Sequence, residues 1–91
     1  MGDDGHTASI FPDQMYLLNS NNVCAVAVHP ESGQKRITLT GNVINNADKI
    51  YFLVTGKSKA EVMKEILEKK NGYLKYPAAH IQTNNTYTFW P

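Results

Sequence analysis

Two short runs of almost wholly apolar residues constrain the fold more than any other feature of this 91-residue chain. They are residues 23–28 (VCAVAV) and residues 50–55 (IYFLVT). Continuous apolar runs of this length, rich in β-branched and aromatic side chains, are typical of strands buried on both faces of a sheet. Such strands are usually parallel and joined by helical crossovers, so the chain is expected to have an α/β fold.

Four other segments have weaker patterns. Residues 37–40 (ITLT) alternate apolar side chains with threonine, and residues 86–90 (TYTFW) are rich in β-forming residues, so both are expected to be strands. Residues 13–18 favour a short helix. Residues 42–48 favour one or two helical turns, with Asn42 as the N-cap.

Residues 58–70 give the strongest helix signal in the chain. Ser58 and Glu61 have the Ser-x-x-Glu spacing of a capping box, and Gly72 is expected to end the helix. An apolar stripe at helical spacing is formed by Ala60, Met63, Ile66 and Leu67. This stripe predicts packing against a sheet rather than a cofactor site.

The balance of elements is uneven, with about four strands and only one strong helix. A parallel sheet requires helices on both faces, so one helix leaves it poorly covered. We therefore expect residues 1–91 to be a single partial domain, part of a doubly wound, mostly parallel sheet. Exposed strand edges and an apolar face are expected to favour self-association or pairing with a missing N-terminal part.

Composition excludes several classes of function. The formal net charge is +1, which gives no reason to expect nucleic acid or an anionic membrane surface as a partner. No apolar run approaches the ~20 residues that a membrane span requires, and no signal-peptide pattern opens the chain. The single cysteine, Cys24, is expected in the core and permits no internal disulfide. These observations favour a cytoplasmic protein.

No metal or cofactor site is expected. One cysteine and scattered histidines do not supply four convergent metal ligands, and we expect His29 and His80 to lie in loops without such a role. The sequence has no glycine-rich phosphate loop of the kind that binds nucleotides.

The densest polar cluster lies in the first twelve residues, which are expected to form a loop. It contains Asp4 and His6 on either side of Gly5. A carboxylate beside a histidine is the usual arrangement for a general base, because the carboxylate fixes the ring tautomer and stabilises the imidazolium. Asp-Gly-His also occurs in ordinary surface turns, so this spacing alone leaves both interpretations open.

The wider sequence around the cluster is more specific. Residues 2–12, GDDGHTASIFP, closely resemble the signature loop of 6-phosphogluconolactonases, G-x-D-G-H-T-A-S-L-F-P. Residues 35–63 resemble a later segment of that family, with its Arg-Ile-Thr-Leu-Thr strand and its Gly-x-x-Lys-Ala helix start. Residues 76–91 resemble its Pro-Ala stretch and last strand. The resemblance covers almost the whole chain and corresponds to the C-terminal part of the family.

This resemblance implies hydrolysis of 6-phosphoglucono-δ-lactone, a phosphorylated sugar lactone of the pentose phosphate pathway, at its cyclic ester bond. By the match, His6 is the general base that activates water, and Asp4 orients it or contacts sugar hydroxyls. Lys59, at the lysine of the Gly-x-x-Lys-Ala segment, is expected to hold the substrate phosphate. Arg36 matches the family arginine that opens the strand, and either a phosphate or a carboxylate is a reasonable partner. Asp3 occupies the variable position of the loop and is expected to face solvent.

Two other functions remain open. The related glucosamine-6-phosphate isomerases and deaminases share Asp-Gly-His but usually continue with Ile-Ala-Phe-Asn-Glu, whereas this chain has Thr7, Ala8 and Ser9. The chain is otherwise interpreted as a non-catalytic α/β module that self-associates or binds a partner. Because the preceding part of the family domain is absent from the sequence, we expect the chain to be inactive or feeble alone.

Overall fold

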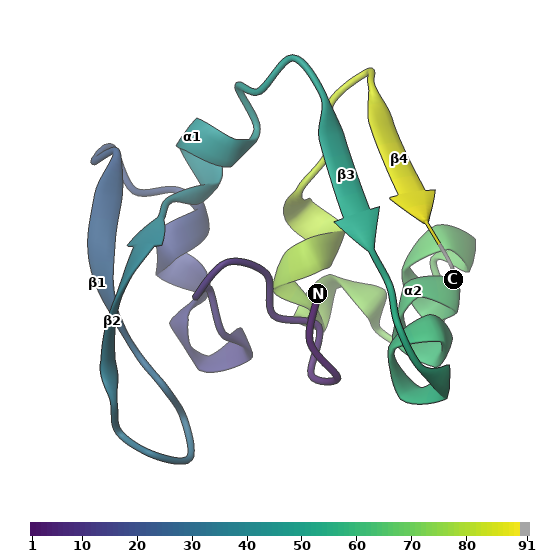
Figure 1. The fold of residues 1–91 in the computed structure, drawn as a ribbon, viewed down its shortest axis with the longest axis horizontal. Coiled ribbons are helices and arrows are strands. Elements are labelled where there is room, and N and C mark those ends of the chain that lie inside the picture. Colours follow the sequence, from purple (N-terminus) through teal and green to yellow (C-terminus); the bar gives the residue numbers. More distant parts are fainter. Residues whose placement is uncertain (90–91) are drawn as a thin grey trace.

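The structure is a computed structural model that describes residues 1–89. It contains two small sheets on opposite sides of the view, with the N-terminal loop and short helical turns between them (Figure 1). The helices and strands, in chain order, are η1 (Pro12–Leu18), β1 (Cys24–Val28), β2 (Lys35–Leu39), α1 (Gly41–Ile44), β3 (Ile50–Leu53), α2 (Lys57–Glu68), η2 (Tyr73–Lys75), η3 (Pro77–His80) and β4 (Thr86–Phe89). Among these residues no helix is long and apolar enough to cross a membrane.

Strands β1 and β2 form an antiparallel hairpin in which Cys24 pairs with Leu39 and Val28 pairs with Lys35. Only Ala27 and Thr38 are buried, one on each strand. The prediction that the 23–28 run is buried on both faces is therefore wrong for this structure, and Cys24 is exposed rather than in the core. The strands pair with each other, and no described element covers most of the hairpin surface.

Strands β3 and β4 are parallel, and Ile50 pairs with Thr86 and Leu53 with Phe89. Along β3, buried and exposed residues alternate: Ile50 and Phe52 are buried, whereas Tyr51 and Leu53 are exposed. The prediction that the 50–55 run is buried on both faces is wrong for the same reason. The predicted strand at 86–90 is confirmed for residues 86–89, and Trp90 lies outside the described residues.

Helix α2 confirms the strong helix signal but has different ends. It begins at Lys57 with Gly56 as the N-cap, and no side chain of residues 1–89 caps it, so the expected capping box of Ser58 and Glu61 is absent. Its last turn is closed by Lys69 in the left-handed conformation, rather than by Gly72. Leu67 is exposed, while Val62 and Met63 are buried, so the packing face is rotated relative to the predicted stripe.

The two short helical segments form near their predicted places. Residues 12–18 form a 3-10 helix, and α1 covers residues 41–44 with Thr40 as its N-cap. Asn42 does not cap α1. Its side-chain amide instead donates to the Ser20 carbonyl oxygen, which ties α1 to the end of η1.

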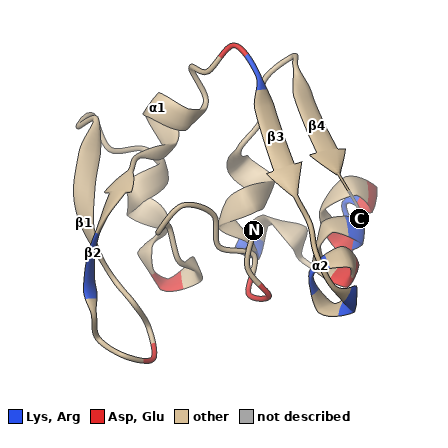
Figure 2. Cartoon of the chain, in the orientation of Figure 1, with Lys and Arg blue, Asp and Glu red and all other residues tan. Residues whose placement is uncertain are grey.

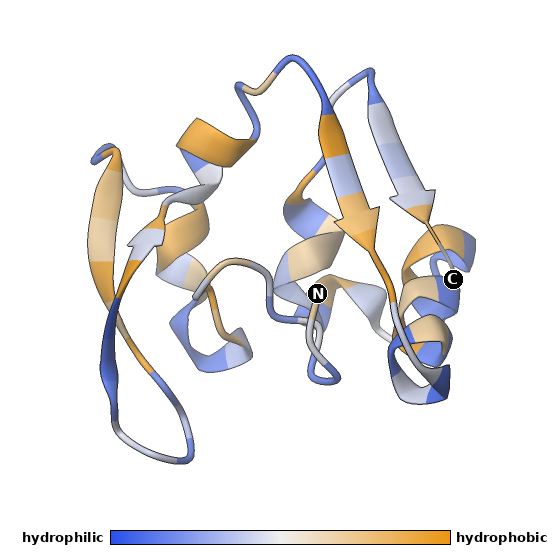
Figure 3. Ribbon diagram, in the orientation of Figure 1, coloured by the Kyte–Doolittle hydropathy of each residue, from blue (hydrophilic) through white to orange (hydrophobic). Residues whose placement is uncertain are grey.

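One core joins the loop, the two sheets and α2. Figure 3 shows apolar segments on η1, both sheets and α2. The buried members of the core come from all parts of the chain: Ile10, Phe11, Leu17, Leu18, Ala27, Ile50, Phe52, Val54, Met63, Ala78 and Ile81. Charged residues instead gather on α2 and on the loops (Figure 2). The core therefore supports the N-terminal loop, although that loop has no regular secondary structure.

The fold is α/β with mixed pairing. The expected single, mostly parallel sheet is replaced in this structure by one antiparallel pair and one parallel pair. The six-residue connection between β1 and β2 explains the first pairing, because a parallel crossover needs about a dozen residues or more. The link from β3 to β4 contains α2 and allows the parallel arrangement.

Candidate active site around His6

The loop of residues 1–11 is shaped by glycine. Gly5 has φ +79°, a conformation that favours glycine, and its backbone N–H donates to the Gly2 carbonyl oxygen at 3.0 Å. The Gly2 N–H in turn donates to the His6 carbonyl oxygen at 2.9 Å. A side chain at Gly2 would overlap the His6 ring, because its Cβ would meet the Cε1 and Nδ1 atoms. The two glycines thus set where the His6 ring can lie.

Within this loop, His6 and Asp4 are in direct contact. The His6 Nδ1 atom is 2.5 Å from Asp4 Oδ1, and the His6 backbone N–H donates to the same oxygen at 3.0 Å. A carboxylate accepts hydrogen bonds, so Nδ1 carries the proton and Nε2 is left with its lone pair. The predicted contact between His6 and Asp4 is therefore present, in the orientation that a general base requires.

The same contact controls the ionisation of Asp4. Partial burial acts to raise the pKa of Asp4, but the backbone and side-chain hydrogen bonds from His6 outweigh it, and the pKa lies below its usual value. Asp4 is therefore a carboxylate at neutral pH. In that form it holds the Nδ1–H tautomer of His6 and would stabilise the imidazolium.

Contacts from the C-terminal third of the chain anchor the loop. The Ala78 backbone N–H donates to the Gly5 carbonyl oxygen at 2.9 Å. The Tyr76 ring packs so closely on Gly5 that a Cβ there would overlap the ring carbons. The Tyr76 hydroxyl donates to Glu65 Oε2 at 2.7 Å, and this bond raises the pKa of Tyr76, together with burial and the Glu65 charge. Helix α2 and η3 thus hold the loop in place.

Phe11, which is 1% exposed, forms the floor beneath His6. The ring centroids of His6 and Phe11 are 4.9 Å apart, and those of His29 and Phe11 are 5.3 Å apart. The Arg36 guanidinium carbon lies 6.0 Å from the same Phe11 centroid. The structure therefore brings Arg36, from β2, to the same aromatic side chain as His6. Its Nε donates to Gln34 Oε1, and in residues 1–89 no carboxylate pairs with it.

Lys59 lies in the first turn of α2, near the start of the loop. Partial burial lowers the pKa of the Met1 α-amino group, and the nearby Lys59 ammonium lowers it further. The adjacent Ser58 hydroxyl donates to Asp3 Oδ1 at 3.0 Å. Asp3 is exposed, as predicted, but it also links the loop to α2. All four predicted site residues thus lie on or beside elements that meet at the loop.

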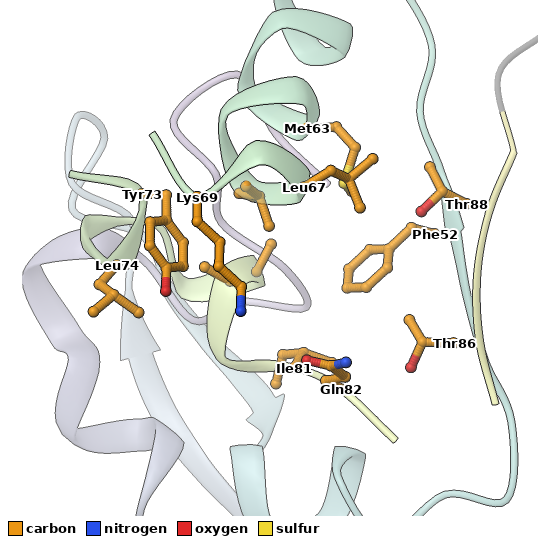
Figure 4. Close-up of a pocket in the computed structure, with 13 residues that line it drawn as sticks. Phe52, Met63, Leu67, Lys69, Tyr73, Leu74, Ile81, Gln82, Thr86 and Thr88 are labelled. Atoms are coloured by element: carbon orange, nitrogen blue, oxygen red, sulfur yellow. The ribbon is translucent and has the colours of Figure 1, made fainter. Parts of the chain in front are cut away.

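Two pockets of different character flank the core. One of about 260 Å³ is lined by residues of the loop and the hairpin turn: Asp3, Asp4, His6, Phe11, His29, Pro30 and Glu31. Another of about 340 Å³ lies between α2, β3, β4 and η2–η3, where Phe52, Met63 and Ile81 surround it with Lys69 and Tyr73 (Figure 4). The second contains none of the predicted site residues, so we place the candidate chemistry in the first. Among residues 1–89, no cluster of three His, Cys, Asp or Glu side chains is suited to a metal ion.

Comparison with known proteins identifies the family. A family model described as glucosamine-6-phosphate isomerases/6-phosphogluconolactonase matches residues 1–90. The chain belongs to this family. The 6-phosphogluconolactonase of Haemophilus influenzae is 49% identical over 90 residues, which are 99% of this chain and 38% of that protein.

Solved structures of this family share the arrangement of the chain. The crystal structure of the devB protein superposes with a TM-score of 0.83 at 41% identity, over 98% of this chain and 37% of that one. The 6-phosphogluconolactonase of Thermotoga maritima gives a TM-score of 0.81 at 28% identity, over 99% and 39%. The family resemblance is thereby confirmed, and the chain spans less than two fifths of the length of these three relatives.

Sequence reasoning missed several supporting residues. The roles of Tyr76, Glu65 and Ser58 depend on contacts between segments far apart in the chain, and no local pattern signals them. Phe11 is visible as part of the Phe-Pro end of the signature loop, but nothing in the pattern indicates that three cationic or ionisable side chains surround it. His29 is expected from the sequence to be an ordinary loop residue, yet it lines the same pocket as His6.

Proposed function

We propose that the chain carries the general-base region of a 6-phosphogluconolactonase and serves the hydrolysis of 6-phosphoglucono-δ-lactone to 6-phosphogluconate. The observation that carries this proposal is the Asp4–His6 contact within a loop of the lactonase type. The family includes isomerases, but in those enzymes Asp-Gly-His is usually followed by Ile-Ala-Phe-Asn-Glu, whereas this chain has Thr7, Ala8 and Ser9. The Haemophilus and Thermotoga relatives, both named 6-phosphogluconolactonases, support the lactonase over the isomerase.

The reaction follows from the tautomer of His6. With Nδ1–H held by Asp4, Nε2 takes a proton from water as the water oxygen attacks the lactone carbonyl carbon. The tetrahedral intermediate then expels the ring oxygen, which receives the proton from the imidazolium. The bond that breaks is the ester C–O bond, and the product acid ionises. Asp4 stabilises the transient imidazolium, and a positioned base of this kind contributes typically 10²–10⁴-fold.

Lys59 and Arg36 are the proposed phosphate contacts. Lys59 stands in the first turn of α2, where backbone N–H groups and the helix dipole favour an anion, and no side chain in the described part of the chain caps that end. Asp3 already approaches this turn through Ser58, so the phosphate would share the site with a nearby carboxylate. Among the described residues, Gln34 is the only side-chain hydrogen-bond partner of Arg36, which leaves other guanidinium N–H groups available for the phosphate.

The fold gives this proposal a structural setting. We propose that the chain supplies the C-terminal portion of a doubly wound domain and acts in the cytoplasm. The exposed face of β3 and β4 carries Tyr51, Leu53, Tyr87 and Phe89, with Tyr51 stacked on Tyr87. A large apolar face of this kind is normally covered, here by a second copy or by the remaining part of such a domain.

The test is a replacement experiment. The segment of the Haemophilus lactonase that matches this chain is replaced by residues 1–90, and opening of 6-phosphoglucono-δ-lactone is followed against its spontaneous rate. We expect the hybrid enzyme to be active and His6→Ala to lower kcat about 10²–10⁴-fold. The isolated 91-residue chain is expected to match the spontaneous rate. A folded hybrid without lactonase activity would overturn the proposal.

The runner-up activity is tested on the same proteins. Turnover of glucosamine 6-phosphate by the hybrid, without opening of the lactone, would assign His6 to sugar ring opening or proton transfer in an isomerase. We expect no such turnover, because residues 7–12 follow the lactonase pattern.

A further inference from the structure

A second histidine lies beside the proposed base and has no role in the mechanism above. His29 follows β1 and begins the turn of the hairpin. Its backbone N–H donates to the Gln34 carbonyl oxygen at 2.9 Å, and its own carbonyl oxygen accepts from the Gly33 N–H at 2.9 Å. The packing of its ring on the buried Phe11 fixes its side chain against the same floor as His6. His29 is therefore held firmly, although it lies in a turn.

The hydrogen bonds of the ring define its tautomer. The backbone N–H groups of Glu31 and Ser32 both donate to His29 Nδ1, each at 3.2 Å. A nitrogen that accepts hydrogen bonds has no proton, so a neutral His29 carries its proton on Nε2. This is the opposite tautomer from His6, whose proton is on Nδ1. Both rings line the pocket, and among residues 1–89 neither Nε2 atom has a hydrogen-bond partner, so His6 offers a lone pair there and His29 offers an N–H donor.

The charge of the pocket indicates which part of a sugar phosphate His29 would meet. Three carboxylates line it, from Asp3, Asp4 and Glu31, whereas Lys59 does not. Carboxylates repel a phosphate and favour hydroxyl groups, which can donate to them. The sugar end of the substrate is therefore the better fit here, and the phosphate is directed toward the cations outside the pocket.

We propose that His29 is a substrate-binding residue that donates a hydrogen bond from Nε2–H to a hydroxyl group of the sugar phosphate on which His6 acts. This inference rests on the proposed lactonase function and adds a sugar-binding residue from the hairpin turn. The β1–β2 hairpin would then contribute to the site, because its turn positions His29 against Phe11 and the loop.

The first measurement is the tautomer itself. Long-range proton–nitrogen NMR correlations on the 15N-labelled 91-residue chain distinguish a protonated from an unprotonated ring nitrogen. In the neutral rings we expect the proton on Nε2 of His29 and on Nδ1 of His6. A proton on Nδ1 of His29 would overturn the inference, whatever the activity of the protein.

The second measurement is a titration of the same chain with 6-phosphogluconate, the reaction product, followed through the ring resonances of the three histidines. We expect His6 and His29 to shift together and His80, which lines neither pocket, to stay unchanged. His80 is a matched internal control, since its Nε2 is already bonded to the Leu74 carbonyl oxygen.

Two variants separate binding from support of the turn. His29→Asn keeps an acceptor for the two N–H groups of the turn but removes the Nε2–H donor, so Kd should rise about 3- to 10-fold, as for one lost hydrogen bond. His29→Gln places an amide donor near the Nε2 position and should recover at least half of that loss on a logarithmic scale. His80→Asn should leave Kd unchanged.

The outcomes distinguish this inference from the proposed function. If His6 responds to the ligand while His29→Asn binds as tightly as the wild type, His29 only supports the turn and the inference is wrong. If neither histidine responds at saturating product, this chain has no such sugar site and the inference fails. The lactonase proposal is then decided separately by the activity of the hybrid enzyme.

Discussion

The His6 loop and the β1–β2 hairpin show that regular secondary structure and tight placement are different properties. The hairpin has a full antiparallel ladder, yet its apolar residues Val26, Ile37 and Leu39 are all more than half exposed. The loop has no ladder, yet Gly2, Gly5 and Ile10 within it are buried. Its shape is held by contacts from distant segments, such as η3 and the residue before it. A candidate catalytic residue is therefore placed by packing rather than by regular structure.

The largest expected effect on stability comes from comparing a glycine in each region, Gly5 in the His6 loop and Gly33 in the hairpin turn, which have similar backbone conformations. Gly5→Ala should reduce the free energy of unfolding by about 3 kcal/mol, from the strain of a positive φ and the overlap with Tyr76. Gly33 in the hairpin turn also has a positive φ, +71°, but no other atom of residues 1–89, its chain neighbours aside, lies within 4 Å of the position that a Cβ would take there. Gly33→Ala should cost only about 1 kcal/mol. Urea unfolding followed by circular dichroism measures both, and equal losses would contradict the comparison.

A smaller effect on stability is expected at Gly2, which lies against the His6 ring. Gly2→Ala places Cβ within 2.9 Å of three His6 ring atoms, so the ring must move away from Asp4. We expect a loss of about 1–2 kcal/mol in stability, since one strong hydrogen bond is broken. A displacement of about 1 Å also lowers a catalysed rate on the order of 100-fold. The His6 ring resonances report the movement, and unchanged resonances together with unchanged activity in the hybrid enzyme would refute the prediction.

The loss of stability at acidic pH tests the Asp4–His6 contact through the charge of Asp4. The pKa of Asp4 is lower in the folded chain than its ordinary value of 3.8. Ionised Asp4 therefore contributes stability that is present above about pH 4 and is lost as the pH falls through the folded-state pKa. The difference in unfolding free energy between wild type and Asp4→Asn should shrink as the pH drops below 3.8. A difference that stays constant from about pH 6 to about pH 2 would show that the carboxylate charge is not involved.

The smallest effect is expected on the outer face of the hairpin. Ile37 is 73% exposed, so Ile37→Thr should change the free energy of unfolding by no more than about 0.5 kcal/mol. The next residue is the control, because Thr38 is buried and its hydroxyl accepts the Ser9 N–H at 3.0 Å. Thr38→Val keeps the shape but leaves that N–H unpaired, and should cost about 1–3 kcal/mol. Thermal unfolding of the two variants should differ accordingly, and a larger loss at Ile37 would show that its face is covered.

Much of the local structure could be predicted from the sequence. The expected strands at 37–40 and 86–90 correspond to β2 (Lys35–Leu39) and β4 (Thr86–Phe89), and helix α2 also formed as expected. These elements follow from short-range patterns, because propensity and periodicity act within a few residues. Helix ends were less predictable. Ser58 fits a capping box, but its hydroxyl bonds Asp3, 55 residues away in the chain, and that partner is invisible to a local pattern.

Burial was the property that sequence reasoning judged worst. The 23–28 and 50–55 runs are apolar enough for strands covered on both faces, and yet Cys24, Tyr51 and Leu53 are exposed. An apolar run indicates that its side chains favour burial. It does not indicate whether the elements that would bury them belong to these 91 residues. The exposed aromatic face of β3 and β4 is the clearest example.

The sequence by itself determined the family, the loop that holds Asp4 and His6, and the helix that carries Lys59. These follow from residue types at fixed spacing, which persist however the segments are packed. Only the tertiary structure decided that β1 and β2 pair antiparallel, that Tyr76 and Ala78 anchor the loop, and that Phe11 gathers His6, His29 and Arg36 around one ring. Several of these contacts join segments far apart in the sequence, such as Gly5 and Ala78, and they arise because one small core must be shared by every element.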